Sequence, residues 1–249
     1  MVISSVEAVS EGSFAATSAS WIRIFEYSGS IASPRQAAFH HKFDVITGKA
    51  LWIVTAGRRD LQERYKRKYY RDIILVGYLP TFPDLTSEGA KAEGKSYKTP
   101  IECFRSSLAP HSIFGAWAVE NWRWYIESLE NSLEDATGLA VLGLRETGED
   151  QKYQPGDLQT LQRHEEMVHE TLAALEANMR VFASLYKFYS CLRKNEHFHL
   201  RHDVAESIEI FRDQVEEFIS DIDHLVQRAS TLLKITDGRK QLIVQHFQS

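Results

Sequence analysis

The last hundred residues carry the feature that most constrains the fold, an apolar pattern with alternating spacings of three and four residues. Eighteen of the nineteen positions in this pattern are apolar, and Glu165 is the exception. Such sustained heptads are typical of long helices that pack side by side. We therefore predict an antiparallel coiled-coil hairpin with helices over residues 158–192 and 204–235. The seam positions are Leu158, Leu161, Glu165, Val168, Leu172, Leu175, Met179, Phe182, Tyr186, Tyr189, Val204, Ile208, Phe211, Val215, Phe218, Ile222, Leu225, Ala229 and Leu232.

The first third of the chain contains shorter patterns that favour strands. Residues 21–27 alternate as a strand does, and residues 39–46 and 50–55 are two apolar runs separated by a turn containing Gly48. A glycine at this place favours a β-hairpin, because tight hairpin turns need positive φ. Residues 59–71 have helical character. This part is therefore expected to mix helices and strands.

These patterns divide the chain into three parts. Residues 1–20 are rich in Ser and Ala and are expected to be a disordered tail. Residues 21–150 should form a small α/β domain, and residues 151–249 the stalk-like hairpin. Residues 100–134 have helical spacing, whereas residues 137–157 contain glycines and Pro155 and are expected to be a linker. The predicted fold class is α+β and mostly helical.

Charge and cysteine usage exclude several classes of function. The net charge of −5 argues against a general polyanion binder, so we expect no nucleic-acid partner. Cys103 and Cys191 have no metal-site or disulfide spacing, which fits a reducing, cytoplasmic compartment. The longest uncharged run, residues 106–119, is shorter than the roughly 20 residues that cross a bilayer. We therefore expect no transmembrane segment.

An acidic stripe on the second long helix is the candidate metal site. Eight acidic residues and one basic residue lie between Asp203 and Asp223. Their mutual repulsion would be relieved by a divalent cation with oxygen ligands, and Mg²⁺ binds one or two carboxylates together with waters. The alternative, which we favour, is a solvated helix face. The candidate ligands for a weak Mg²⁺ site are Glu209, Asp213, Glu216 and Glu217.

A basic patch interleaved with tyrosines has three interpretations. It can contact phosphates of nucleic acid or anionic lipid, pack near the acidic stripe, or form a solvated amphipathic helix. We favour the solvated helix because the net charge of the chain is negative. The patch comprises Arg58, Arg59, Arg64, Lys66, Arg67, Lys68 and Arg71.

No catalytic motif emerges from the sequence. It contains no phosphate-binding glycine loop, no nucleophile elbow and no His-Glu metalloprotease motif. His164 is interpreted as a helix-surface residue, and Trp117, Trp122 and Trp124 as core residues. We therefore expect that the protein is not an enzyme.

Several segments, in their order along the chain, resemble fungal CorA-like proteins of the magnesium-transporter family. The likeness extends over residues 21–249, and no single motif is diagnostic. The segments are Trp21–Tyr27, Arg35-Gln36, His41–Asp44, Leu51–Val54, Ala118–Ile126 and Leu232–Leu242.

The resemblance implies a funnel-shaped cytoplasmic domain that feeds a stalk helix and assembles as a pentamer around a pore. It also implies that cytoplasmic carboxylates sense magnesium. The pore helices and the Gly-Met-Asn signature of the family do not occur in this sequence. The chain therefore resembles either a truncated transporter domain or a soluble relative that has lost transport.

Two functions remain open from the sequence. The first is a regulatory or assembly domain that senses metal ions and does not transport by itself. Its partners would be further copies of the chain or membrane-bound CorA-like subunits, at the cytosolic face of a membrane in a longer form. The second is a soluble coiled-coil interaction module. Without membrane helices we expect a monomer or a weakly associated chain.

Overall fold

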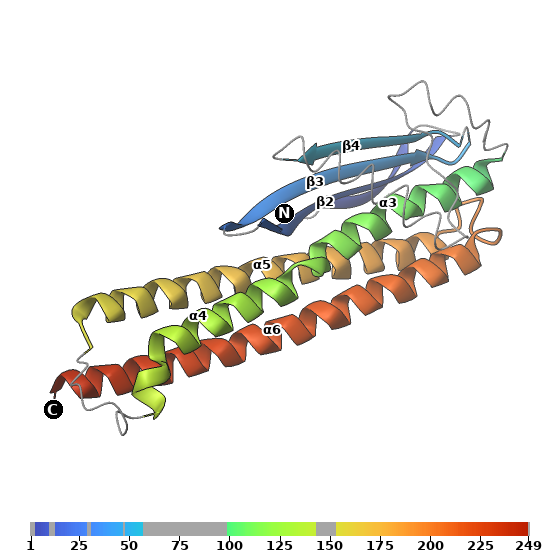
Figure 1. Cartoon of the computed structure of the whole chain (residues 1–249). Coiled ribbons are helices and arrows are strands. Elements are labelled where there is room, and N and C mark those ends of the chain that lie inside the picture. The colour runs from blue at the N-terminus through green and yellow to red at the C-terminus, as the bar shows by residue number, and fades with distance from the viewer. Residues whose placement is uncertain are drawn as a thin grey trace.

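The computed structural model of the chain describes residues 3–9, 13–28, 31–46, 48–56, 99–142 and 153–248 (Figure 1). The described part is mostly helical, as the sequence predicts. Its strands come first and its helices follow. The elements are β1 (Ile3–Val9), β2 (Ser13–Ser28), β3 (Ile31–Asp44), β4 (Ala50–Ala56), α3 (Pro100–Glu120), α4 (Trp122–Leu142), α5 (Pro155–Lys194) and α6 (Ala205–Gln248).

The described strands form one antiparallel sheet in the order β1-β2-β3-β4. β3 and β4 make the predicted hairpin, and Gly48 has a φ of 70° in its turn, which glycine adopts without steric cost. Asp44 holds this turn together. Its backbone N–H donates to Lys49 O at 2.9 Å, and its Oδ1 accepts from the Ile46 N–H at 3.0 Å.

The structure departs from the predicted disordered tail over residues 1–20. β1 and the first part of β2 lie there, paired from Ile3 with Ala19 to Val9 with Ser13. A β-ladder is built from backbone N–H and C=O groups. A segment rich in Ser and Ala can therefore join one although its composition does not predict a strand. The predicted helix over residues 59–71 lies outside the described residues.

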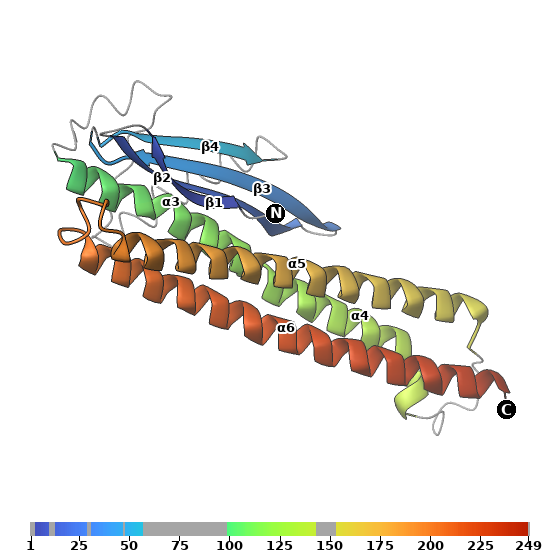
Figure 2. The same cartoon turned by 180° about the vertical axis from the view of Figure 1, so that it is seen from behind.

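α5 and α6 lie side by side and run in opposite directions along the length of the molecule (Figures 1 and 2). α5 begins at Pro155, after a capping box in which the Gln154 backbone N–H donates to Asp157 Oδ2 at 2.7 Å. α6 has 44 residues and continues through Gly238, so it is about 66 Å long at about 1.5 Å per residue. Both predicted long helices are present and longer than predicted. Their coiled-coil packing stays a prediction.

The helices before the hairpin also differ in their bounds from the prediction. Residues 100–134 form two helices, because α3 ends at Glu120 and α4 begins at Trp122. Both ends of the predicted linker over residues 137–157 are helical. α4 continues to Leu142, and α5 already begins at Pro155.

The predicted seam lies in the core. Thirteen of its nineteen positions are buried, six are half-buried, and none is exposed. α5 buries a wider face than a two-helix seam requires, because it also contacts α4, β1 and β2. Asn178 is one of these additional buried residues, and its side-chain amide donates to Ala118 O on α3 at 3.3 Å.

α3 approaches α6 closely at Gly115. A Cβ atom added there would lie 2.2 Å from Cε2 of Phe218, so a larger residue would collide with that ring. The Phe218 ring is itself packed against Phe182 of α5, with ring centroids 5.5 Å apart. Gly115 therefore allows three helices to meet around one aromatic side chain.

The assigned seam predicts that two substitutions on α6 change the free energy of unfolding by very different amounts. Val215→Asp should destabilise the protein by about 3 kcal/mol or more, because Val215 is 1% exposed and the new carboxylate would be buried without a partner. Ile210→Asp should have little effect, because Ile210 is 62% exposed. Urea unfolding followed by circular dichroism measures both. Equal stability of Val215→Asp and the parent would show that the seam is wrongly assigned.

Candidate functional site

The acidic stripe of α6 points into solvent. Asp213, Glu216 and Glu217 are exposed, on the side of the helix away from the buried seam. Among the described residues, no group of three or more His, Cys, Asp or Glu side chains is arranged to hold a metal ion. The three carboxylates can therefore offer a cation one or two ligands at a time. Mg²⁺ binding by these residues stays a prediction.

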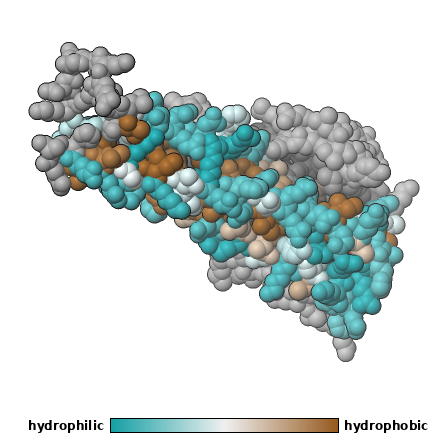
Figure 3. All heavy atoms as spheres, turned by 90° about the horizontal axis from the view of Figure 1, so that it is seen from below, coloured by the Kyte–Doolittle hydropathy of each residue, from teal (hydrophilic) through white to brown (hydrophobic). Residues whose placement is uncertain are grey.

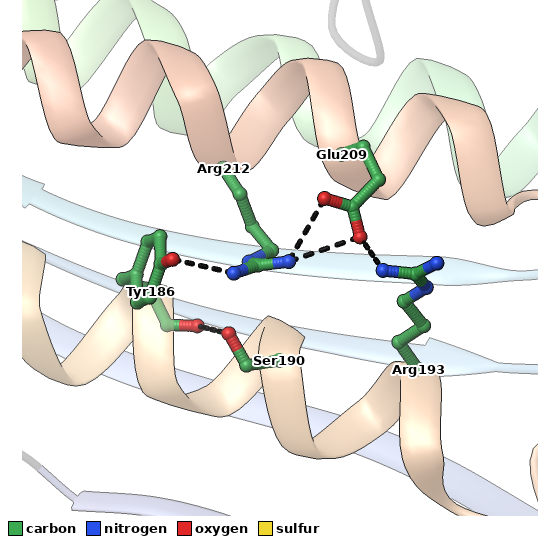
Figure 4. A network of polar contacts seen from close by, with 5 residues as sticks. All are labelled: Tyr186, Ser190, Arg193, Glu209 and Arg212. Carbon is green, nitrogen blue, oxygen red and sulfur yellow. Dashed lines mark hydrogen bonds and ion pairs between the residues drawn. The ribbon is translucent and has the colours of Figure 1, made fainter.

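Glu209, the fourth candidate ligand, differs from the other three because it belongs to a network that joins α5 to α6 (Figure 4). Its carboxylate accepts from Arg193 and, at 2.9 Å, from Arg212. Arg212 also donates to the Tyr186 hydroxyl, and its guanidinium carbon lies 4.5 Å from the centre of the Tyr186 ring. A carboxylate held by two arginines is a poor cation ligand. The network instead connects α5 to α6 through an ion pair and a hydrogen bond.

The predicted basic patch, from Arg58 to Arg71, lies outside the described residues. Its interpretations as a phosphate or lipid contact, an intramolecular contact or a solvated helix all stay predictions.

A buried histidine pair connects the sheet to the helices, and the sequence analysis did not find it. His41 comes from β3 and His111 from α3, and Nδ1 of His41 lies 3.3 Å from Nε2 of His111. The His111 ring also packs against Tyr189 of α5 and Phe211 of α6, with centroids 5.8 Å apart in each case. Side chains from four elements therefore meet here. The only sequence signal was that His111 lies in the long uncharged run.

Burial keeps this histidine pair neutral. Desolvation, reinforced by the neighbouring His40, lowers the pKa of His41 to about 3. Desolvation, reinforced by His41, also lowers the pKa of His111 well below its usual value. The unfolded chain binds protons at these residues below about pH 6.5, while the folded chain does not. Their contribution to stability is therefore complete above pH 6.5 and is lost as the pH falls.

The histidine pair predicts acid sensitivity of the fold. Between pH 7 and about pH 5.5 the free energy of unfolding should fall by about 2–3 kcal/mol, because each histidine contributes about 1.4 kcal/mol per pH unit below its unfolded pKa. Urea unfolding across this range measures the slope. The double variant His41→Phe, His111→Phe should have a flatter profile. An unchanged profile in that variant would contradict the assignment.

His164 also differs from the prediction of a helix-surface residue. It is 5% exposed, and its Nε2 lies 2.8 Å from Leu129 O on α4. The prediction for His164 is wrong because it assumed that α5 packs only against α6, whereas α5 also packs against α4. The tryptophan prediction holds for Trp117 and Trp122, which are buried, and is wrong for Trp124, which is 60% exposed.

A second feature that the sequence did not reveal is a cavity of about 290 Å³ between α4 and α6, here called the α4–α6 groove. Its α4 wall carries two carboxylates and its α6 wall two guanidinium groups, with apolar side chains between them. The lining includes Glu130, Leu133 and Glu134 from α4 and Arg228, Ile235 and Arg239 from α6.

Ion pairs cross the groove at two points. Arg228 Nε donates to Glu130 Oε1 at 2.7 Å, and Arg239 Nη2 donates to Glu134 Oε2 at 2.6 Å. Arg239 also donates to Thr137 Oγ1 at 2.6 Å. The paired residues are about 100 positions apart in the sequence, so no local pattern could predict them.

Comparison with known proteins finds one related family. The profile of a family described as CorA-like transporters matches residues 22–72 and 81–141. The matched segments include residues 22–28 of β2, all of β3, β4 and α3, and nearly all of α4. This match supports a relation to the CorA-like family. No curated protein matches the chain at a significant level.

The match does not extend over α5 and α6. Within residues 99–142 and 153–248, no helix combines the length and the apolar composition that crossing a membrane requires.

Proposed function

We propose that this chain is a cytoplasmic CorA-like domain with a regulatory or assembly role, and that it does not transport ions by itself. The observation that carries the proposal is the family match over residues 22–72 and 81–141. The fungal character that the resemblance suggests belongs to the same proposal. The helices support the proposal because their apolar sides are buried against one another and against the sheet, so they form one packed domain.

The regulatory role is proposed to be sensing of a divalent cation by the acidic stripe. Asp213, Glu216 and Glu217 are exposed on successive turns of α6, where like charges repel. A bound Mg²⁺ would offset this repulsion. Carboxylates on one exposed helix offer few direct ligands, and Mg²⁺ loses its waters reluctantly. We therefore expect a dissociation constant of about 1 mM, equivalent to about −4 kcal/mol.

Cation sensing predicts a modest thermal shift. At about 10 mM Mg²⁺ the protein should gain about 1.4 kcal/mol, which corresponds to a rise of about 3–5 °C in melting temperature. The triple variant Asp213→Asn, Glu216→Gln, Glu217→Gln should lose this rise. It should also melt higher than the parent without Mg²⁺, because repulsion along the helix is removed. Differential scanning fluorimetry and isothermal titration calorimetry measure both effects.

A matched control separates a site from a change in net charge. The variant Glu166→Gln, Glu170→Gln, Glu176→Gln removes the same number of charges from exposed positions on α5. It should keep the shift caused by Mg²⁺. Absence of both heat and melting shift in the parent chain at about 10 mM Mg²⁺, ten times the expected constant, would exclude the sensor and leave the stripe as a solvated face.

A soluble interaction module is the second candidate function. The observation that favours it is the α4–α6 groove, which presents apolar and charged side chains to solvent on two adjacent helices. A surface of this composition resembles the centre and rim of a protein interface. The two functions can be distinguished, because an interaction module binds a partner protein and needs no cation, whereas the sensor binds Mg²⁺.

A further inference from the structure

The histidine pair lies at the boundary between the sheet and the helices, beside a contact that does not titrate. His41 and Phe43 are two positions apart on β3, so their side chains lie on the same face of the sheet. On α3, His111 follows Phe104 by seven positions, which is about two helical turns, so these side chains also share a face. The rings of Phe43 and Phe104 are in contact, with centroids 5.3 Å apart. β3 therefore meets α3 through one apolar pair and one pair that can take up protons.

The hydrogen bond between the two histidine rings depends on their protonation state. A neutral imidazole has one N–H group and one bare nitrogen, so two neutral rings supply both a donor and an acceptor, whichever ring donates. When both rings are protonated, every ring nitrogen carries a hydrogen and the acceptor is lost. Two like charges then face each other across 3.3 Å in a site where His41 is 3% and His111 1% exposed. The closed contact is therefore incompatible with two protons.

The described neighbours of the pair include two further titratable groups, His40 of β3 and Tyr189 of α5. His40 lowers the pKa of His41, in addition to the effect of burial. Tyr189 packs against the His111 ring, and burial raises the pKa of its hydroxyl, so it is neutral at and below pH 7. Neither group offers a negative charge that would stabilise a protonated ring. The uncharged neighbours include Phe211 of α6 and the strand partners of His41, which are Ser18 of β2 and Trp52 of β4.

We propose that protonation of His41 and His111 releases the sheet from the helices while the helices stay packed on one another. The inference goes beyond the proposed function, because the signal is the proton concentration and not Mg²⁺. When the sheet separates from α3, both rings enter water and bind protons with an ordinary pKa of about 6.5. The released state therefore binds more protons than the attached state in mild acid, so a fall in pH favours release.

The helices have contacts of their own that do not involve the sheet. α5 and α6 pack along the seam, and α3 and α4 each contact α6. The sheet contacts α3, α4 and α5 from one side only. Figure 3 shows the molecule from below, the side away from the sheet, where hydrophilic side chains predominate. Release of the sheet would therefore uncover one side of the helices and leave the contacts among them intact.

The number of protons taken up sets the size of the effect. Two groups with a pKa of about 6.5 in the released state should raise the equilibrium constant for release about 70-fold between pH 7 and about pH 5.5. Near pH 5.5 the logarithm of this constant should rise by about 1.8 for each unit that the pH falls, because each released ring is then about 90% protonated.

Hydrogen exchange of the full chain, without added Mg²⁺, tests the release. Exchange rates divided by the intrinsic rates at each pH give the opening constant of each amide. We expect amides of β2 and β3 to open about 70-fold more at about pH 5.5 than at pH 7. They should be less protected than residues 208–232 of α6 at both pH values. Equal protection of the sheet and α6 would overturn the proposal, because the sheet would then open only with the whole fold.

Two double variants test whether the histidine pair is the sensor. His41→Phe, His111→Phe replaces both rings with aromatic rings that bind no proton, so opening of the sheet should become nearly independent of pH over this range. His197→Phe, His224→Phe is the matched control, because it removes two exposed histidines elsewhere, and it should keep the pH dependence of the parent. A sheet that still opens with the parent's pH dependence in the first variant would refute the pair as the sensor.

The pH dependence of the parent chain provides a test that needs no variant to fold. The slope of the opening constant of β3 against pH counts the protons taken up on release. A slope near 1.8 at about pH 5.5 is expected for two histidines. A slope near zero would overturn the proposal. Neither result bears on Mg²⁺ binding, which is measured separately.

Discussion

The packing of α5 against α6 is the contact on which the other elements depend. Thirteen buried seam positions connect the two helices, and the remaining faces of the pair support α3, α4 and the sheet. At the aromatic cluster formed by Tyr189 and Phe211, the ring centroids are 4.9 Å apart. His111 of α3 packs onto this cluster and meets His41 of the sheet. The sheet is thus attached to the helices through side chains that the helical pair positions.

The sequence predicts the long helices well because their apolar spacing reflects the helical period itself. Even the polar exception in the seam has a structural explanation. The carboxylate of Glu165 is 2.8 Å from Nζ of Lys240, which lies in the last part of α6, beyond the apolar seam that ends at Leu232. The extension of α6 through Gly238 therefore provides the partner for the one charged seam residue.

The remaining features depend on tertiary contacts that a local pattern does not contain. The wide buried face of α5, with His164 and Asn178 in it, results from packing against α3, α4 and the sheet as well as α6. The ion pairs of the α4–α6 groove join residues far apart in the sequence. For the same reason the sequence predicts four candidate Mg²⁺ ligands in the acidic stripe, although one of them, Glu209, is held by Arg193 and Arg212. Charge spacing alone does not reveal which carboxylates are already paired.

Hydrogen exchange of the full chain tests most directly whether the α5–α6 pair is the foundation of the fold. Amides that open only in global unfolding exchange most slowly. The account predicts that the slowest amides lie in Leu161–Leu192 of α5 and Ile208–Leu232 of α6, and that they share one opening free energy. Slow exchange in β2 and β3 together with rapid exchange across Ile208–Leu232 would contradict it.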